Sequence, residues 1–264
     1  MGKVIGVVSL KGGVGKTSSV VALGHAFSSL GKKVLLVDGN LSAPNLGMHL
    51  NVFPPKKSLQ DVLMRKVNVS EAIENLDNFD LISSEMYHNF ELELFSLKNR
   101  LSLLKNKYDF IIVDSSPKLD EETLAVILAS DQILVVTTPD VPTLGTTVKA
   151  VKFAKKRGAK ISGLILNKVY NKKFELPMNN IEESLEVPIL AVIPHDVNFL
   201  KALKEFRPMT ECSPNSPSSN EFMKLAAALA GEKYKPFKLR NLFGWIRPKR
   251  QDINRVIYYK SVFK

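Results

Sequence analysis

The apolar residues of this chain gather into short continuous runs, separated by stretches with the spacing of helices. Six runs rich in Val, Ile and Leu occupy residues 3–9, 33–37, 110–113, 132–136, 161–166 and 188–193. Apolar and polar positions do not alternate within them, which indicates strands buried on both faces. With helical stretches between most of the strands, the pattern predicts an α/β fold in which a mostly parallel sheet has helices on both faces.

The residues that begin and end helices support this order. Helices are predicted over residues 16–30, 59–64, 71–74, 121–129, 143–157 and 221–230. Ser58, Ser70 and Asp120 are the expected N-caps of the second, third and fourth of these helices. Gly31 and Gly231 are expected to end the first and the last. Residues 213–219 are rich in Ser and Pro and are expected to form a loop.

The composition is that of one ordinary soluble domain with a full core. The chain has 264 residues, of which 45% are hydrophobic and 24% charged, and this excludes disordered and collagen-like classes. No apolar run approaches the roughly 18 residues that cross a bilayer, and residues 1–10 lack the features of a signal peptide. We therefore expect neither secretion nor a membrane-spanning segment. The single cysteine, Cys212, agrees with a reducing compartment.

The positive charge is concentrated at the C-terminal end. The whole chain has a formal charge of +11, and residues 232–264 contribute +8 of it through ten basic and two acidic residues. Such a segment suits an anionic partner, either a membrane or a nucleic acid, although a solvated end without a partner would have the same composition. We therefore divide the chain into a domain over residues 1–231 and a basic tail over residues 232–264.

The strongest chemical signal is the glycine-rich stretch LKGGVGKT at residues 10–17, between the first predicted strand and the first predicted helix. The general phosphate-binding pattern G-x-x-x-x-G-K-[ST] has glycine where this chain has Leu10. The chemistry of the pattern is retained. Its glycines let backbone N–H groups surround phosphate oxygens, Lys16 supplies a positive charge for the β and γ phosphates, and Thr17 offers a hydroxyl to Mg²⁺. The sequence therefore predicts a nucleoside triphosphate site.

A second lysine at the front of this stretch, Lys11, makes KGGVGKT resemble the deviant Walker A motif of the MinD/ParA family of P-loop ATPases. The resemblance covers about residues 1–231 and is closest to the MinD branch. It is carried by further segments: VLLVD at 34–38, PNLG at 44–47, YDFIIVDSSP at 108–117, TTPDVP at 137–142, LNKV at 166–169 and IPHD at 193–196. It implies a three-layer P-loop NTPase fold, ATP and Mg²⁺ as cofactors, ATP hydrolysis, and a homodimer that closes around ATP.

The resemblance also implies roles for individual residues. The nucleotide-binding loop would comprise Lys11, Gly12, Gly13, Val14, Gly15, Lys16, Thr17 and Ser18, with Lys11 reaching the partner's phosphates. Thr17, Asp38 and Asp114 would surround Mg²⁺, with a turn residue at the end of a strand as the lesser alternative for Asp38. Asn167 would bind the adenine edge and Pro194 and Asp196 would lie beside the base, with a capping role as the alternative for Asp196. Lys11, Lys16, Asp38 and Asn40 are the catalytic candidates.

Two positions depart from the family pattern. Where the family has Asp-x-Asp at its first switch, with the second Asp orienting the attacking water, this chain has Asp38, Gly39 and Asn40. An asparagine can hold a water by hydrogen bonds but cannot act as a base, so hydrolysis is expected to be slow. Lys118 stands where the second switch usually has glycine, and its side chain could alter that loop or simply point to solvent.

The tail contains one amphipathic segment, at about residues 237–248. On a helix Leu239, Leu242, Phe243 and Ile246 share one face, and Trp245 and basic residues flank that face. The segment resembles the short membrane-targeting helix of MinD, and a helix docked on the domain's own surface is the alternative. Residues 252–264 extend past what the resemblance implies; a second interfacial segment is one interpretation of them, and the pattern assigns them no role.

These features favour an ATP-dependent dimerising switch that lies in the cytoplasm and attaches to the inner face of the membrane. It would position division or other surface machinery together with a regulatory or cargo protein that the sequence does not identify. The alternative is a ParA-like DNA-partitioning ATPase whose basic surface holds DNA nonspecifically. The apolar face of the tail favours lipid over DNA. An iron-sulfur carrier is excluded because its bridged cluster needs paired cysteines.

Overall fold

The computed structural model describes residues 2–86, 92–232 and 249–263, and within them one mixed sheet of eight strands forms the centre of the molecule. The strand order is β3-β4-β2-β5-β1-β6-β7-β8, and every neighbouring pair is parallel except β3 and β4. The strands are β1 (Lys3–Val8), β2 (Val34–Asp38), β3 (Glu74–Asn75), β4 (Asp80–Ile82), β5 (Phe110–Asp114), β6 (Gln132–Thr137), β7 (Ile161–Val169) and β8 (Ile189–Pro194). All six predicted strands are present, and the prediction of a mostly parallel, buried sheet is confirmed.

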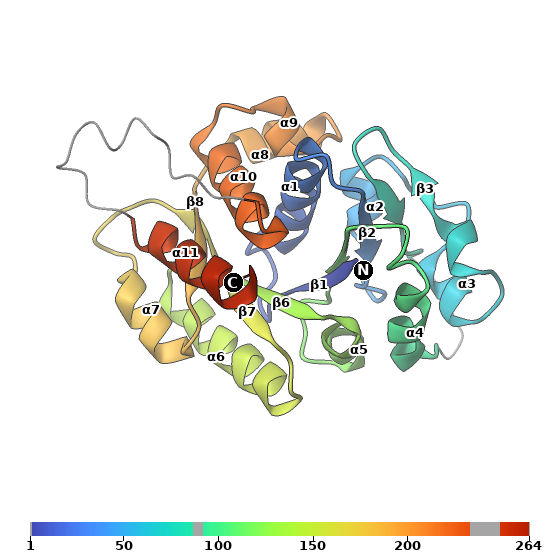
Figure 1. Ribbon diagram of the computed structural model, residues 1–264, viewed down its shortest axis with the longest axis horizontal. Coiled ribbons are helices and arrows are strands. Elements are labelled where there is room, and N and C mark those ends of the chain that lie inside the picture. Colours follow the sequence, from blue (N-terminus) through green and yellow to red (C-terminus); the bar gives the residue numbers. More distant parts are fainter. Residues whose placement is uncertain (1, 87–91, 233–248, 264) are drawn as a thin grey trace.

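Helices cover both faces of the sheet, which gives the three layers of a P-loop NTPase fold (Figure 1). The helices α1 (Lys16–Ser29), α8 (Asn198–Lys204), α9 (Met209–Cys212) and α10 (Pro217–Ala230) lie together on one face. The helices α4 (Leu97–Ser102), α5 (Glu121–Ala129), α6 (Val141–Lys156) and α7 (Met178–Leu185) cover the other. The short helices α2 (Leu46–His49) and α3 (Leu59–Leu63) flank the β3–β4 end. Three buried clusters of aliphatic side chains join these layers.

Several helix boundaries follow the predicted caps, and three do not. Ser58 and Asp120 cap α3 and α5 as expected. Ser70 caps no helix, because a 3₁₀ turn over Val69–Ala72 is capped by Asn68 and leads into β3. Helix α6 begins before residue 143 because the Asp140 carboxylate accepts a hydrogen bond from Thr143 N. The segment 213–219 is a loop only in its first half, since Ser216 caps α10.

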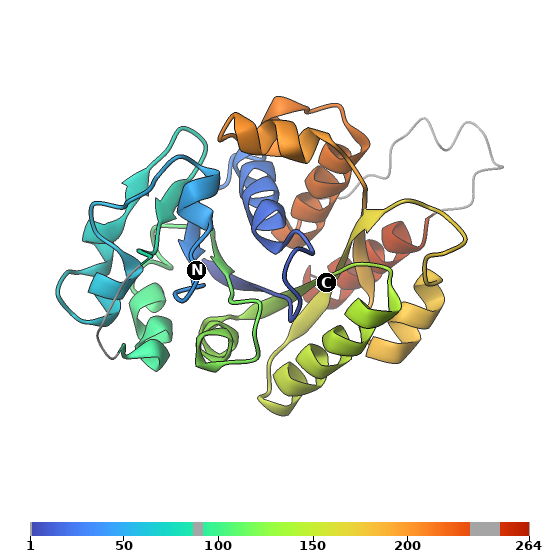
Figure 2. The ribbon, with the colours of Figure 1, turned by 180° about the vertical axis from the view of Figure 1, so that it is seen from behind.

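The end of the chain returns to the domain as helix α11 (Arg250–Phe263), which the sequence pattern did not predict. Helix α11 lies on the near side of the molecule in Figure 1 and on the far side in Figure 2, where the loop between β1 and α1 is in front. The parallel strands therefore have two distinct edges: the nucleotide loop follows their carboxyl ends, and α11 crosses their amino ends. In the described parts of the chain, no helix has the length and apolar character needed to span a membrane.

Candidate nucleotide site

A cavity of about 490 Å³ opens at the carboxyl edge of the sheet, where the strand ends bring together segments distant in sequence. Its lining includes the whole predicted loop from Lys11 to Ser18, together with Asn40, Asn167, Pro194 and Asp196. Asp38 and Asp114 are fully buried beside it, at paired positions of β2 and β5. The structure thus brings all of the predicted site residues to one edge.

The loop between β1 and α1 has the shape that surrounds an anion. Gly13 and Gly15 have φ angles of 77° and 89°, in the left-handed region that favours glycine. Gly15 also has no room for a side chain, because an added Cβ would lie 2.3 Å from Asn167 Nδ2. The N-terminus of α1 follows directly, so its backbone N–H groups and helix dipole favour a phosphate group here.

Lys16 and Thr17 both contact Asp114. The Lys16 ammonium donates to the carboxylate of Asp114 and to the backbone oxygen of Ser115, and both Lys16 and Asp114 are buried. Thr17 Oγ1 donates to Asp114 Oδ2 over 2.6 Å. The hydroxyl and the carboxylate oxygen that would hold Mg²⁺ are therefore already adjacent, and hard oxygen ligands are those Mg²⁺ prefers. To reach a bound phosphate, Lys16 has to leave Asp114.

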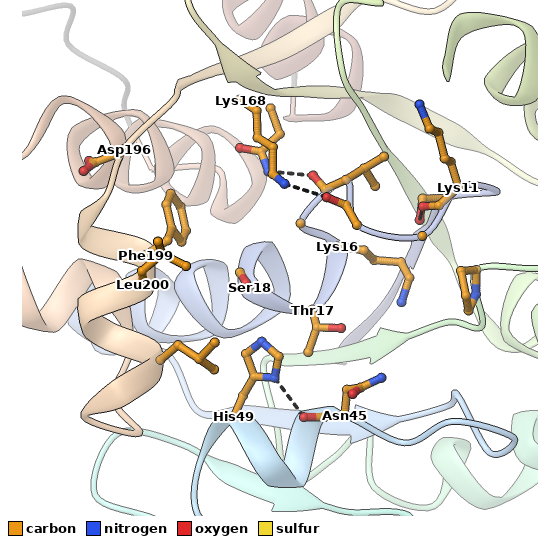
Figure 3. Close-up of a pocket in the computed structure, with 18 of the residues that line it drawn as sticks. Lys11, Lys16, Thr17, Ser18, Asn45, His49, Lys168, Asp196, Phe199 and Leu200 are labelled. Atoms are coloured by element: carbon orange, nitrogen blue, oxygen red, sulfur yellow. Dashed lines mark hydrogen bonds between the residues drawn. The ribbon is translucent and has the colours of Figure 1, made fainter. Parts of the chain in front are cut away.

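Lys11 points in a different direction from Lys16 (Figure 3). Its ammonium donates to Thr143 Oγ1 over 2.6 Å and lies 3.3 Å from Asp140 Oδ1, at the start of α6. Partial burial acts to raise the pKa of Asp140, but hydrogen bonds from Thr138, Thr143 and Lys11 outweigh it and hold that pKa at about 2. Asp140 is therefore charged at neutral pH. In this state it holds Lys11 within its own chain.

The first switch, residues 38–46, is organised around Asp38. The Asp38 carboxylate accepts hydrogen bonds from the backbone N–H groups of Asn40, Asn45 and Leu46 at 2.9–3.2 Å. Burial, with Asp114 nearby, raises the pKa of Asp38 to about 7. Asp38 thus has a clear structural role in shaping the switch, and a water-mediated contact with Mg²⁺ stays a prediction.

Asn40 lines the cavity, and its side-chain amide uses only one of its two polar atoms in hydrogen bonds within the described structure. Its Nδ2 donates to the Ala43 oxygen, whereas its buried Oδ1 has no hydrogen-bond partner among the described residues. An unpaired buried acceptor beside a cavity fits a group that binds a water in the presence of ligand. Lys118, the other departure from the family pattern, is exposed and does not line the cavity.

The opposite end of the cavity is lined by the ends of β7 and β8. Asn167 Nδ2 donates to Val14 O over 2.7 Å, and Asn167 Oδ1 is buried without a hydrogen-bond partner in the described structure. The amide therefore supports the loop with its donor and keeps an acceptor for a ligand. Asp196 lines the cavity, and its carboxylate also accepts from Asn198 N at 2.9 Å, which agrees with the predicted alternative of a capping role.

The sequence pattern did not indicate several of the residues that line the cavity. Lys168 donates to Gly13 O over 2.7 Å, and His49 Nδ1 lies 2.9 Å from Asn45 O (Figure 3). Phe199 and Leu200 of α8 add an apolar wall. Lys168 directly follows Asn167 in the segment LNKV, and this position could have indicated that Lys168 lines the cavity. Helix α8 carried no comparable motif.

The predicted amphipathic segment at residues 237–248, with Leu239, Leu242, Phe243, Trp245 and Ile246, lies outside the described residues. The division of the chain at residue 231 stays a prediction. The structure adds that residues 250–263 pack on the domain, so the C-terminal end does not consist of a solvated tail throughout.

Two protein-family models match the chain. One describes an AAA domain and matches residues 2–162, and the other, over residues 102–230, describes the NUBPL iron-transfer P-loop NTPase. The second match covers less than half of the chain. The iron-transfer chemistry in its description would need paired cysteines, whereas the chain has only Cys212.

Relatives over most of the chain are consistent with the geometry of the site. An uncharacterized ATP-binding protein of Methanocaldococcus jannaschii is 31% identical over 235 residues, covering 87% of this chain and 88% of that protein. The cell division ATPase MinD of Pyrococcus furiosus is 34% identical with a TM-score of 0.79, covering 86% of this chain and 97% of that chain. The septum site-determining protein MinD of Pyrococcus horikoshii, complexed with Mg-ADP, is 30% identical with a TM-score of 0.80, covering 93% and 100%. The chain belongs to the MinD/ParA family of P-loop ATPases, enzymes that hydrolyse ATP with Mg²⁺.

Proposed function

We propose that this ATPase is a MinD-like switch: two copies close around ATP, and the ATP-bound dimer attaches to the inner surface of the cytoplasmic membrane. There it positions division or other surface machinery through a regulatory or cargo protein. Two MinD structures at 30% identity or more support the choice of this branch. The observation that carries the proposal is the position of Lys11.

Lys11 supports a dimerising switch because it is held by residues other than those of its own phosphate loop. Its ammonium is held by Asp140 and Thr143 and points in another direction from Lys16, so it is free to act on a phosphate outside its own loop once Asp140 releases it. Asp140 and Lys11 are both partly exposed, and an ion pair of this kind stabilises a protein by at most about 1 kcal/mol. A phosphate of a partner-bound ATP, with more charge, would compete effectively for Lys11. Closure of the dimer would then follow from ATP binding.

The chemistry within one protomer follows from the site. Lys16 would exchange Asp114 for the β and γ phosphates, and Thr17 with Asp114 would hold Mg²⁺, which offsets the charge that develops on the phosphate oxygens. The free oxygen of Asn40 would accept a hydrogen bond from the attacking water. A neutral amide orients that water without taking its proton, so we infer slow intrinsic turnover and a switch that persists in the ATP state.

The membrane part of the proposal rests on the apolar face predicted for residues 237–248 and on the basic character of the C-terminal end. A single short amphipathic segment binds a bilayer weakly, and two segments in one dimer bind with an avidity about 10² to 10⁴ higher if both reach the same surface. Dimerisation therefore supplies a means by which ATP controls attachment.

ATP turnover measured with and without anionic liposomes tests the nucleotide, the membrane and their coupling together. We expect slow hydrolysis in solution and a change in rate when anionic liposomes are present. Duplex DNA at equal phosphate concentration is the matched control. Stimulation by DNA, with co-sedimentation on DNA and none on liposomes, would instead support a ParA-like partitioning ATPase.

A further inference from the structure

Helix α11 buries three polar side chains together with Tyr258, and it exposes three aliphatic side chains. Gln251, Asp252, Arg255 and Tyr258 face the domain, and Arg255 is 0% exposed. Ile253, Val256 and Ile257 are 45%, 36% and 60% exposed. Surface helices of soluble proteins have the opposite arrangement, with apolar residues against the core.

The buried side is fixed by specific contacts. Arg255 donates to Glu221 Oε2 at 2.9 Å, to Asp252 Oδ1 at 2.6 Å and to Leu190 O at 2.8 Å. One turn further along the helix, Tyr258 OH donates to Gln132 Oε1 at 3.0 Å. Rotation of the helix to bury its aliphatic side would break these bonds and leave buried charges unpaired. The outward position of the aliphatic side chains is therefore a property of the fold.

These contacts place α11 along the amino edge of the sheet. Leu190 and Gln132 stand at the beginnings of β8 and β6, and the Lys3 ammonium at the beginning of β1 lies 4.5 Å from the ring centre of Phe263. The outer face of α11, which we define as Ile253, Val256, Ile257 and Lys260, has the i, i+3, i+4, i+7 spacing of one helical side. It is turned away from the nucleotide edge.

A lysine-lined pocket continues the same edge beyond α11. This lysine pocket has a volume of about 560 Å³, includes Phe263 in its wall, and contains Lys3, Lys32, Lys33, Lys105 and Lys107. Lys32 pairs with Glu232 and Lys105 pairs with Asp131. The ammonium groups of Lys3, Lys33 and Lys107 form no ion pair within the described part of the chain.

The electrostatics of the pocket favour an anionic ligand. Burial lowers the pKa of Lys3, and repulsion from Lys160 lowers it further, against the opposing effect of Asp131. A neighbouring phosphate would relieve this repulsion. Phosphates and carboxylates are the groups that complement unpaired ammonium groups of this kind.

We propose that the outer face of α11 and the lysine pocket together form a binding surface for an anionic lipid membrane. This inference rests on the membrane association in the proposed function and adds a second contact to it, on the folded domain. Lysines beside exposed aliphatic side chains match headgroup phosphates beside the acyl boundary. Nucleic acid would use the lysines but not the aliphatic residues. A second protein copy would need about 800 Å² per partner, far more than three partly exposed side chains supply.

The membrane contact through α11 and the lysine pocket should not depend on which nucleotide is bound. The outer face of α11 and the nucleotide cavity lie at opposite ends of the parallel strands, so one protomer can contact lipid through this surface with either ATP or ADP bound. The contact should be weak by itself, because few side chains enter the interface.

A fluorescent probe at position 257 tests the contact directly. In a full-length Cys212→Ser background, Ile257→Cys carries an environment-sensitive fluorophore, and Phe174→Cys, which is 77% exposed on the loop after β7, is the control position. Vesicles of anionic phospholipid should shift the emission of the probe at 257 to the blue with either nucleotide, and neutral vesicles should not. The probe at 174 should not respond. If the protein binds anionic vesicles and the probe at 257 stays silent, the inference is wrong.

Charge and apolar variants complete the test. Ile257→Glu should weaken binding to anionic vesicles at least about tenfold, since it removes an inserted side chain and adds a charge. Lys33→Glu should weaken it about five- to thirtyfold, and Lys172→Glu, with the same charge change at the opposite edge, should not. Loss of self-association in Ile257→Glu with unchanged vesicle binding would assign the surface to a second copy and overturn the proposal. The variants can behave as expected while the wild type binds vesicles equally with ATP and with ADP. That result would support the membrane-binding surface proposed here and refute the ATP-dependent switch of the proposed function.

Discussion

Lys16 links the phosphate loop to the carboxylate beside it. The Lys16 ammonium forms a buried ion pair with Asp114. ATP and Mg²⁺ have to break this ion pair when they bind. Loss of one charged contact to phosphate costs about 1.5 to 3 kcal/mol. Lys16→Ala should therefore weaken Mg·ATP binding about 10- to 100-fold in calorimetry. Lys33→Ala, at the amino edge, should bind ATP as the wild type does, and unchanged affinity in Lys16→Ala would refute the site.

Asn40 is the residue at which the chain departs most clearly from its family. Because an amide orients water without accepting its proton, Asn40→Asp should raise the turnover number, and a missing orienting group accounts for on the order of 10² to 10⁴ in rate. The affinity for ATP should change little, because the loop and Lys16 provide the phosphate contacts. Phosphate release in single turnover measures the effect. A wild type as fast as Asn40→Asp would mean that another group positions the water.

The sequence was most informative about residues whose chemistry is fixed by a motif. KGGVGKT, the Asp residues at the ends of two strands, and Asn167 all lie at one edge, as their positions predicted. The hydrogen-bond partners could not be predicted in the same way. That Asp38 binds three backbone N–H groups depends on how residues 40–46 fold, which propensity does not determine.

At the level of single elements, the start of α6 holds Lys11 within its own chain. Asp140 both caps α6 and pairs with Lys11, and asparagine is an equally good cap without the charge. Asp140→Asn should therefore release Lys11 without shortening the helix. We expect dimers to form at lower ATP concentrations than in the wild type, as measured by light scattering. Asp120→Asn, the same change at the cap of α5, is the control and should leave the ATP requirement unchanged.

Helix α11 depends on one buried arginine. Removing Arg255 would leave Glu221 and Asp252 buried without their main partner, which costs about 3 to 5 kcal/mol. Arg255→Ala should lower the urea midpoint and increase hydrogen exchange across α11 and α10. Lys155→Ala removes an exposed pair with Glu186 and should have no measurable effect. Equal stability of Arg255→Ala and wild type would show that α11 is not held by this cluster.

Strands and helices with a clear apolar pattern in the sequence were predictable, and elements that depend on tertiary contacts were not. The six apolar strands and most longer helices followed their patterns because burial on both faces leaves a continuous apolar run. Helix α11 was not predicted because much of its inner face is polar, so neither its amphipathic pattern nor its charge indicates docking on a core. The short α8 and the β3–β4 pair are equally dependent on their neighbours.

In the whole molecule, the two edges of the sheet have different roles. The carboxyl edge binds nucleotide. We propose that it also binds the second protomer and that the amino edge contacts the membrane. A nucleotide-independent contact at an amino edge would give weak binding, and dimerisation through Lys11 would raise the avidity by bringing two membrane-binding tails together.

Flotation on anionic vesicles with ATP and with ADP tests this account most directly. More protein should float with ATP than with ADP, because only ATP closes the dimer. Lys11→Ala should abolish that difference, and Phe243→Glu should remove most of the bound protein. Equal flotation of the wild type with ATP and with ADP would contradict the central claim that nucleotide controls attachment, even if the ATP site were correct.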